Sequence, residues 1–166
     1  MRKLLLIACF ALFAISANAQ NEFRGGLNFG LPLGDAGDLA TFAIAVDLGY
    51  LFEITEEVQV GPTIGYSHSF GDEIDTILGS IDLDDVQFLP IAATGHYNFT
   101  DQIWFGADVG YAVGLNDGND GGFYYSPKFA YGVTEQIDII AAFRSVVFED
   151  GSWDIISLGV EIGILN

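Results

Sequence analysis

Long stretches of this sequence alternate between large apolar residues and small or polar ones. In the segment 41–52 every second residue is large and apolar: Phe42, Ile44, Val46, Leu48, Tyr50 and Phe52. The segments 103–116 and 156–164 follow the same rule. Successive side chains of a β-strand point to opposite faces, so this period of two predicts strands with one apolar face. A helical period fits none of these segments, and the pattern therefore favours an all-β fold.

Repeated along the chain, the pattern predicts eight strands, at about 22–32, 41–52, 58–70, 86–99, 103–116, 123–134, 137–148 and 153–165. Such strands exceed the usual globular length of about 5–6 residues. They are long enough to cross a bilayer at a tilt. Their connections alternate between short turns and longer acidic, glycine-rich loops, notably 33–40, 71–85 and 116–122. This alternation is typical of an outer-membrane barrel.

The first nineteen residues have the features of a secretory signal peptide. Arg2 and Lys3 precede an apolar run over 4–16, and Ala17-Asn18-Ala19 forms a cleavage motif. The run is too short to span a bilayer as a helix. We expect cleavage after Ala19, which leaves 20–166 as one exported domain. Cys9, the single cysteine, is then lost, so no disulfide or thiolate metal site is expected.

Charge is distributed very unevenly beyond residue 19. The basic residues there are Arg24, Lys128 and Arg144, against 23 acidic residues. Binding to nucleic acid requires clusters of Lys and Arg that displace counterions from phosphates. We therefore expect no nucleic-acid partner, and no motif in the sequence indicates a cofactor.

The few basic residues indicate which strand face points inward. They share the face opposite the aromatic residues with four mid-strand acids: Asp47, Asp108, Asp138 and Glu161. That face is rich in Gly and Ala, which suits a narrow eight-stranded interior where charges must pair. Aromatic residues gather at both ends of the other face, as in interfacial girdles. The pattern predicts that the apolar face contacts lipid; a soluble, lipocalin-like periplasmic binding barrel is the alternative.

The chain resembles the OmpA/OmpX-like family of small outer-membrane β-barrel proteins. The segments that carry the resemblance are "GGLNFGLPLGDAGD", "VDLGYLF", "VGPTIGYSHSFG", "FLPIAATGHYNF" and "FGADVGYAVGLNDGNDGGFYYSPKFAYG". The resemblance implies a single eight-stranded antiparallel up-and-down transmembrane barrel, monomeric and in contact with outer-membrane lipid and lipopolysaccharide. It also implies insertion by the barrel assembly machinery. Such barrels usually end in an aromatic residue, whereas this chain ends Ile164-Leu165-Asn166.

The inward charges form the main candidate site: Arg24, Asp47, Asp108, Lys128, Asp138, Arg144 and Glu161. We expect three pairs, namely Arg24 with Glu161, Asp108 with Lys128, and Asp47 with Arg144 across the lumen. Eight strands leave room only for side chains, so the network is expected to fill the lumen. A narrow ion channel is the alternative interpretation.

A lipid A-modifying enzyme is the catalytic alternative, because some eight-stranded barrels deacylate or palmitoylate lipid A. The deacylases of that kind carry His-x-Ser on one strand face. Here His68 is flanked by Ser67 and Ser69, which fall on the opposite face, and His96 is followed two residues later by Asn98. A nucleophile and its base must lie within hydrogen-bonding distance. We therefore expect no enzymatic activity.

Acidic loops supply the remaining candidates. The loop 71–85 interleaves acids with Ile and Leu and is expected to form a solvated hairpin, an edge that pairs with a partner strand, or a divalent-cation contact. Candidate surface Ca²⁺ ligands are Asp82, Asp84, Asp85, Asp117 and Asp120. The segment 116–122 matches neither an EF-hand nor a phosphate-binding loop, and its glycines predict a hairpin turn. Together these features predict a non-enzymatic barrel that serves envelope structure or surface interaction.

Overall fold

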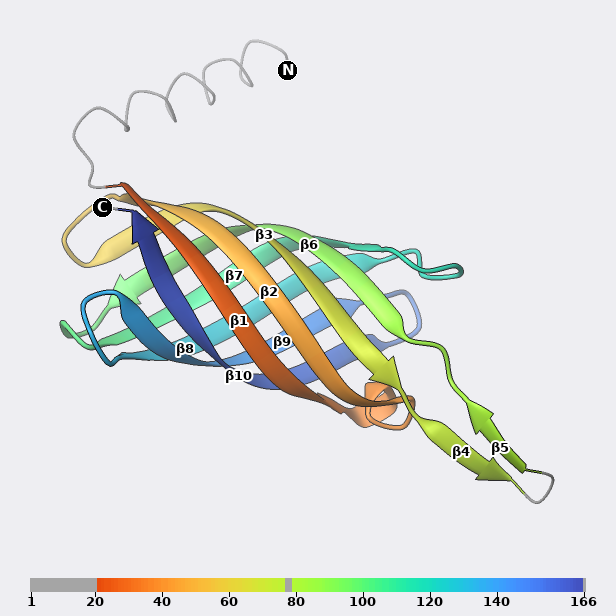
Figure 1. Cartoon of the computed structure of the whole chain (residues 1–166). Helices are drawn as coiled ribbons and strands as arrows, with labels where there is room; N and C mark the ends of the chain where they lie inside the picture. Colours follow the sequence, from red (N-terminus) through yellow and green to blue (C-terminus); the bar gives the residue numbers. More distant parts are fainter. Residues whose placement is uncertain (1–20, 77–78, 166) are drawn as a thin grey trace, which may run out of the picture.

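A computed structural model describes residues 21–76 and 79–165. Eight long strands close into one antiparallel barrel, in the spatial order β1-β10-β9-β8-β7-β6-β3-β2 (Figure 1). These strands are β1 (Asn21–Leu33), β2 (Ala40–Glu53), β3 (Val58–Gly71), β6 (Val86–Asn98), β7 (Ile103–Gly114), β8 (Gly122–Gly132), β9 (Ile137–Val147) and β10 (Ser152–Leu165). The predicted fold class is confirmed. The predicted signal peptide and its cleavage site lie outside the described residues.

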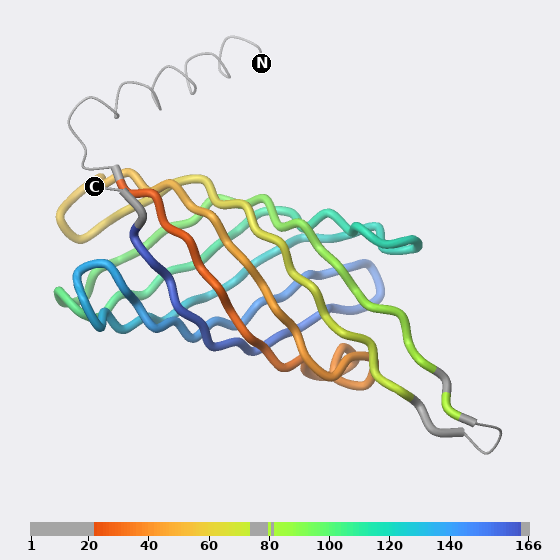
Figure 2. The backbone as a smooth tube through the Cα atoms, in the orientation of Figure 1, coloured from red at the N-terminus to blue at the C-terminus, as the bar shows by residue number. Residues whose placement is uncertain are grey.

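Closure depends on the first and last strands. β1 pairs antiparallel with β10 from Phe23↔Leu165 to Leu33↔Asp154, so no barrel strand has a free edge. An unpaired edge would leave backbone N–H and C=O groups unsatisfied in lipid. Figure 2 shows the strands wound at a tilt around a narrow interior. Among the described residues, no helix combines the length and the apolar character needed to cross a membrane.

Three short turns at one end of the barrel share a local sequence, "TEEV", "TDQI" and "TEQI". In each turn the Thr hydroxyl accepts hydrogen bonds from the backbone N–H groups two and three residues later. This side-chain cap fixes a tight connection, because Thr satisfies donors that the turn would otherwise leave free. The start of β1 and the end of β10 lie at this same end (Figure 1). We call it the inner end and the opposite one the outer end.

The outer end carries the longer connections. A 3₁₀ turn, η1 (Gly34–Ala36), joins β1 to β2. Between β3 and β6 the chain forms a separate two-stranded hairpin, β4 (Glu73–Thr76) and β5 (Gly79–Asp82), which extends beyond the barrel rim (Figure 1). The loop 71–85 is therefore a hairpin extension, one of the forms predicted for it.

Side chains on the barrel strands divide as the alternation predicted. Large apolar residues on the outward face are widely exposed, for example Leu158 at 64 %. The inward face buries the charged residues, with Asp108 only 1 % exposed. Apolar residues outside and charged residues inside are the reverse of a soluble lipocalin-like barrel, so that alternative is wrong.

Candidate functional site

The inner half of the lumen holds a layer of paired charges. Arg24 Nη1 lies 3.1 Å from a Glu161 oxygen and also donates to Asp138, while its Nε lies 3.0 Å from Glu22. Register explains this convergence, because Glu161 on β10 is directly opposite Asp138 on β9 and Gly26 on β1. Glu22 was not predicted as a member, although it lies two residues before Arg24 on the same strand face.

Two aromatic residues extend the layer toward the inner opening. The Trp104 indole N–H donates to Asp138 Oδ2 at 3.1 Å. The His96 ring stacks on Trp104 at 4.0 Å between centroids and lies near the Thr94 hydroxyl, 3.3 Å away. All these polar contacts point into the lumen, so His96 is enclosed in the inner half of the barrel.

Two further ion pairs lie in the middle of the barrel. Lys128 Nζ lies 2.7 Å from Asp108 Oδ2, and both side chains are almost fully buried. Arg144 reaches across the lumen to Asp47 with both Nη atoms, one at 3.2 Å from Oδ1. The structure thus brings together each of the three predicted pairs and adds Asp138 to the Arg24 group.

Neutral groups add contacts to the Asp47–Arg144 pair. Asn28 donates to Asp47 Oδ2 at 2.9 Å, and Arg144 Nη1 donates to the Tyr124 hydroxyl at 3.4 Å. The space for Asp47 depends on glycine: a Cβ placed on Gly65 would lie 2.5 Å from Asp47 Oδ1. The small inward residues therefore leave volume for charged side chains rather than for water.

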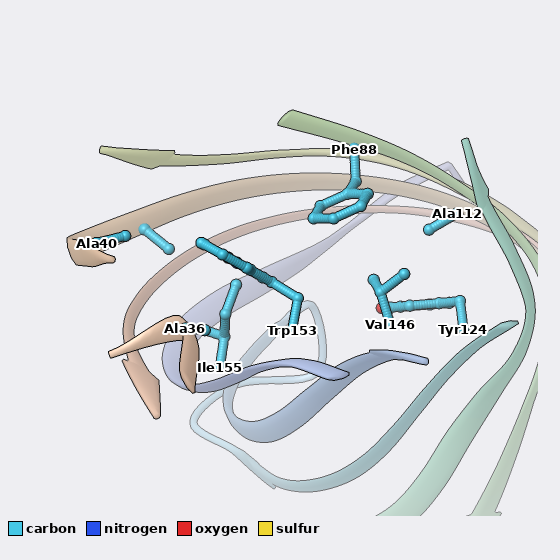
Figure 3. Packing of buried hydrophobic residues seen from close by; sticks show 9 residues of the cluster. Ala36, Ala40, Phe88, Ala112, Tyr124, Val146, Trp153 and Ile155 are labelled. Atoms are coloured by element: carbon cyan, nitrogen blue, oxygen red, sulfur yellow. The ribbon is translucent and has the colours of Figure 1, made fainter. Parts of the chain in front are cut away.

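The outer half of the lumen is filled by apolar side chains instead. Phe88, Val146, Trp153 and Ile155 point inward and pack with small alanines (Figure 3). Phe88 is 1 % exposed, and its ring lies 6.5 Å from that of Trp153. The Trp153 indole N–H donates to Ser69 Oγ at 3.1 Å, which satisfies the one polar group of this side chain. Sequence reasoning did not find this apolar layer.

Little empty space remains between the two layers. The cavity beside the charged layer, which touches His96 and Lys128, measures about 10 Å³. The cavity beside Phe88 and Arg144 measures about 10 Å³ as well. A single water needs roughly 10–15 Å³ measured in this way. Neither cavity can hold a chain of waters.

Above the apolar layer, the outer end opens into a depression of about 810 Å³, here called the outer cup. Its walls are η1, the segment 116–121 and the segment 148–153, and Val86 and Phe88 contribute from β6. Acidic side chains surround it: Asp35, Asp117, Asp120, Glu149 and Asp150. The predicted turn at 116–122 is therefore also one wall of a cavity, which the sequence did not indicate.

Two asparagines hold that wall in place. Asn116 Oδ1 accepts from the Gln87 N–H at 3.0 Å, and Asn119 Nδ2 donates to the Gln87 carbonyl at 3.0 Å. Asn119 Oδ1 also accepts from the Gly121 N–H at 3.1 Å. Gly118 and Gly121 have φ of 80° and 73°, which few other residues adopt.

His68 lies on the outward face near the outer end, away from both neighbouring serines. Its ring contacts the Tyr66 hydroxyl and the Asp85 carboxylate, each at 3.0 Å. Ser67 and Ser69 are buried inside the barrel. The His-x-Ser geometry of the deacylases is therefore not formed here, and Tyr66 and Asp85 were not predicted as partners of His68.

The candidate Ca²⁺ ligands stay dispersed. Within residues 21–76 and 79–165, no three His, Cys, Asp or Glu side chains come close enough to share a metal ion. Asp85 is engaged elsewhere: its Oδ1 accepts from the Gly71 N–H at 2.9 Å. That hydrogen bond, together with His68, holds the pKa of Asp85 below its usual value.

Solved structures with the same architecture are membrane barrels. Ail of Yersinia pestis in a phospholipid nanodisc is similar with a TM-score of 0.58 and 12 % identity, over 87 % of this chain and 100 % of that chain. The N-terminal barrel of Pseudomonas aeruginosa OprF gives 0.55 and 15 %, over 89 % and 100 %. Neisserial surface protein A gives 0.53 and 16 %, over 89 % and 99 %.

These identities establish the fold alone, and no curated protein sequence matches the chain. The sequence profile of the outer membrane protein beta-barrel domain matches residues 4–162, which is nearly the whole chain. The closed eight-stranded barrel of the structure agrees with that family's description. The chain belongs to the outer membrane protein beta-barrel domain family.

Proposed function

We propose that this protein is a non-conducting, non-enzymatic barrel of the outer membrane that acts through its acidic outer end. The observation that supports this most directly is the doubly filled lumen. Paired charges occupy its inner half and its middle, and Phe88 and Trp153 occupy its outer half. A barrel blocked by two layers offers neither a pore nor a cavity through the membrane, so its interactions fall to the outer loops.

Single-channel recording tests the blocked lumen. The protein, refolded in a planar bilayer, should produce no stable current steps at 1 M KCl. An open porin in the same bilayer serves as the positive control. Stable steps whose size changes when Lys128 is replaced by Met would instead support the narrow-channel interpretation, because Lys128 lies in the centre of the lumen.

An enzymatic role would require His68 to act on lipid at the outer interface. His68 contacts a phenol and a carboxylate, and neither adjacent serine reaches it. Mass spectrometry of lipid A from cells with and without the protein should show the same species. A mass change that disappears with His68→Ala would contradict the proposal, whereas Ser67→Ala and Ser69→Ala serve as matched controls on the inward face.

The outer surface limits which partners suit it. Ail of Yersinia pestis has been crystallised with the heparin analogue sucrose octasulfate, a polyanion. In the present chain, the outer loops contain many acids and no Lys or Arg, so a polyanion would be repelled. Contact with the phosphates of lipopolysaccharide then needs bridging divalent cations, each held by one or two exposed carboxylates such as Asp84 or Asp117.

Deleting 73–83 tests whether the β4–β5 hairpin takes part. If the hairpin recruits a partner or a cation, the deletion should abolish capture of that partner or a Ca²⁺-dependent rise in Tm. The barrel is expected to fold without it, because β3 and β6 pair directly below the hairpin. Export by the predicted signal peptide, with cleavage after Ala19 and insertion by the barrel assembly machinery, is part of this proposal. N-terminal sequencing of the protein from purified outer membrane tests the cleavage.

A further inference from the structure

The outer cup has the size of a small-molecule site. Its volume of about 810 Å³ falls within the range of roughly 300–1,000 Å³ typical of ligand pockets. Three loops and the start of β6 meet to form it, so it is not a groove of one loop. The wall 116–121 is fixed in advance by Asn116 and Asn119, which reduces the ordering cost of binding.

The floor of the cup is apolar. Phe148 and Val86 line it beside Phe88 and Trp153, which belong to the packed outer layer of the lumen. Phe148 stacks on Phe88 at 6.2 Å between ring centroids, so the floor continues into the barrel core. A ligand with an apolar body gains contact there without rearranging the barrel.

The charges of the cup have one sign. The lining includes Asp35, Asp117, Asp120, Glu149 and Asp150, and it includes no Lys, Arg or His. Within residues 21–76 and 79–165, the basic residues Arg24, Lys128 and Arg144 are all paired with acids inside the barrel and do not neutralise this rim. A concave site with charges of one sign concentrates ions of the other sign.

We propose that the outer cup binds a small amphipathic organic cation, with its apolar body on the Phe148 floor and its positive groups at the acidic rim. An aromatic floor favours such a ligand further through cation–π attraction. A metal ion alone fits poorly, since no three ligating side chains converge among the described residues. An anion or a polyanion is repelled by the same rim. This inference rests on the proposed function, because it names the ligand class of the outer end.

Fluorescence titration of the intact protein in lipid nanodiscs tests the proposal with dyes of related size. Propidium, an aromatic dication, should bind with higher affinity than ethidium, the related monocation. Anilinonaphthalene sulfonate, an aromatic anion, should not bind, and spermidine, which has charge but no apolar body, should compete only weakly. Propidium binding should also weaken as salt is raised from 50 to 500 mM, as surface charge attraction does.

Variants separate the contributions of rim and floor. Neutralising Asp117, Asp120, Glu149 and Asp150 together (D117N/D120N/E149Q/D150N) should lower propidium affinity about tenfold, the loss expected when both positive charges of the dye lose their exposed acidic partners. Phe148→Ala should weaken propidium and ethidium by similar factors, because it removes floor contact and no charge. The matched control is D82N/D84N, which removes acids from the hairpin at the same end and should leave affinity unchanged.

Three results would overturn the inference: no saturable binding of propidium, equal binding of the anionic dye, or equal loss in the D82N/D84N control. None of these results would contradict the proposed function, provided that the conductance recording shows no current steps. Conversely, current steps would contradict the blocked lumen without bearing on dye binding at the cup, so the two failures are distinguishable.

Discussion

Replacing Asp47 by Asn should be among the most damaging single changes in this barrel. The Asp47 carboxylate accepts hydrogen bonds from both Nη atoms of Arg144 and from the Asn28 amide. The substitution keeps the shape and the Asn28 contact but leaves the guanidinium buried without its anion. Removing one partner of a buried ion pair costs about 3–5 kcal/mol. We expect a loss of that size in the free energy of unfolding.

A double-mutant cycle distinguishes loss of the pair from loss of volume. Arg144→Met removes the cation and retains most of the side-chain bulk. The double variant D47N/R144M leaves neither charge uncompensated, so it should be less destabilised than the sum of the single variants by about 1–3 kcal/mol. The Lys128–Asp108 pair remains intact in every variant and provides an internal reference.

Equilibrium urea unfolding in lipid vesicles measures these values. The chain has two tryptophans, and they report on different layers: Trp104 on the charged layer and Trp153 on the apolar one. If both tryptophans report the same unfolding transition, the data support a two-state analysis. A loss below about 1 kcal/mol for D47N, or strict additivity in the cycle, would refute the argument that the lumen is held by buried ion pairs.

Three further predictions address other parts of the barrel. Phe88→Ala should lower the free energy of unfolding by about 3–5 kcal/mol, as loss of a buried aromatic ring does. Bilayer recordings of this variant should still show no current steps, because the charged layer still closes the lumen. Gly61→Ala should abolish refolding, because the new Cβ would lie 1.8 Å from a backbone carbonyl oxygen of β2. Gly95→Ala should be tolerated, because its Cβ would meet only a methyl group at 3.9 Å. Heat-modifiable migration on a gel distinguishes the folded from the unfolded barrel. The pKa of Asp85 is lowered because its charged form accepts a hydrogen bond from the Gly71 N–H. That hydrogen bond is at full strength above the ordinary aspartate pKa of about 3.9. It is lost as the pH falls through the lowered pKa of Asp85. The Gly71 amide shift in NMR should follow that titration below pH 3.9 and become flat in Asp85→Asn.

The strands and their inward face could be predicted from the sequence because lipid imposes a strict rule. A residue on the outward face must be apolar, so the alternation of apolar and polar residues continues along the whole strand. The two ends of each strand can therefore be located in the sequence. The predicted strand 103–116 corresponds to β7 at Ile103–Gly114, and 58–70 corresponds to β3 at Val58–Gly71. Differences occur at the ends, where the residues leave the membrane and the rule no longer applies.

The ion pairs could be predicted for a related reason. Antiparallel register fixes the height of each residue, so Lys128 and Asp108 on adjacent strands had to lie close together. The apolar outer layer could not be found in this way. Phe88 and Trp153 lie near strand ends, where an inward aromatic residue has the same sequence signature as a residue of the interfacial girdle. The outer cup was also beyond reach, because it depends on three connections that are far apart in the sequence and meet only when the barrel closes.

The distribution of the three basic residues determines the charge of the outer end. A buried carboxylate needs a cation, and Arg24, Lys128 and Arg144 are all committed to that role inside the barrel. Asp154 at the outer end is instead satisfied by the hydroxyls of Ser145 and Ser152, at 2.6 and 2.9 Å. Among the residues that the structure describes, no Lys or Arg is therefore left to neutralise the acids of the outer loops. Within the described residues, charge compensation there falls to groups outside the barrel, and the cation site proposed for the outer end depends on this scarcity of basic residues.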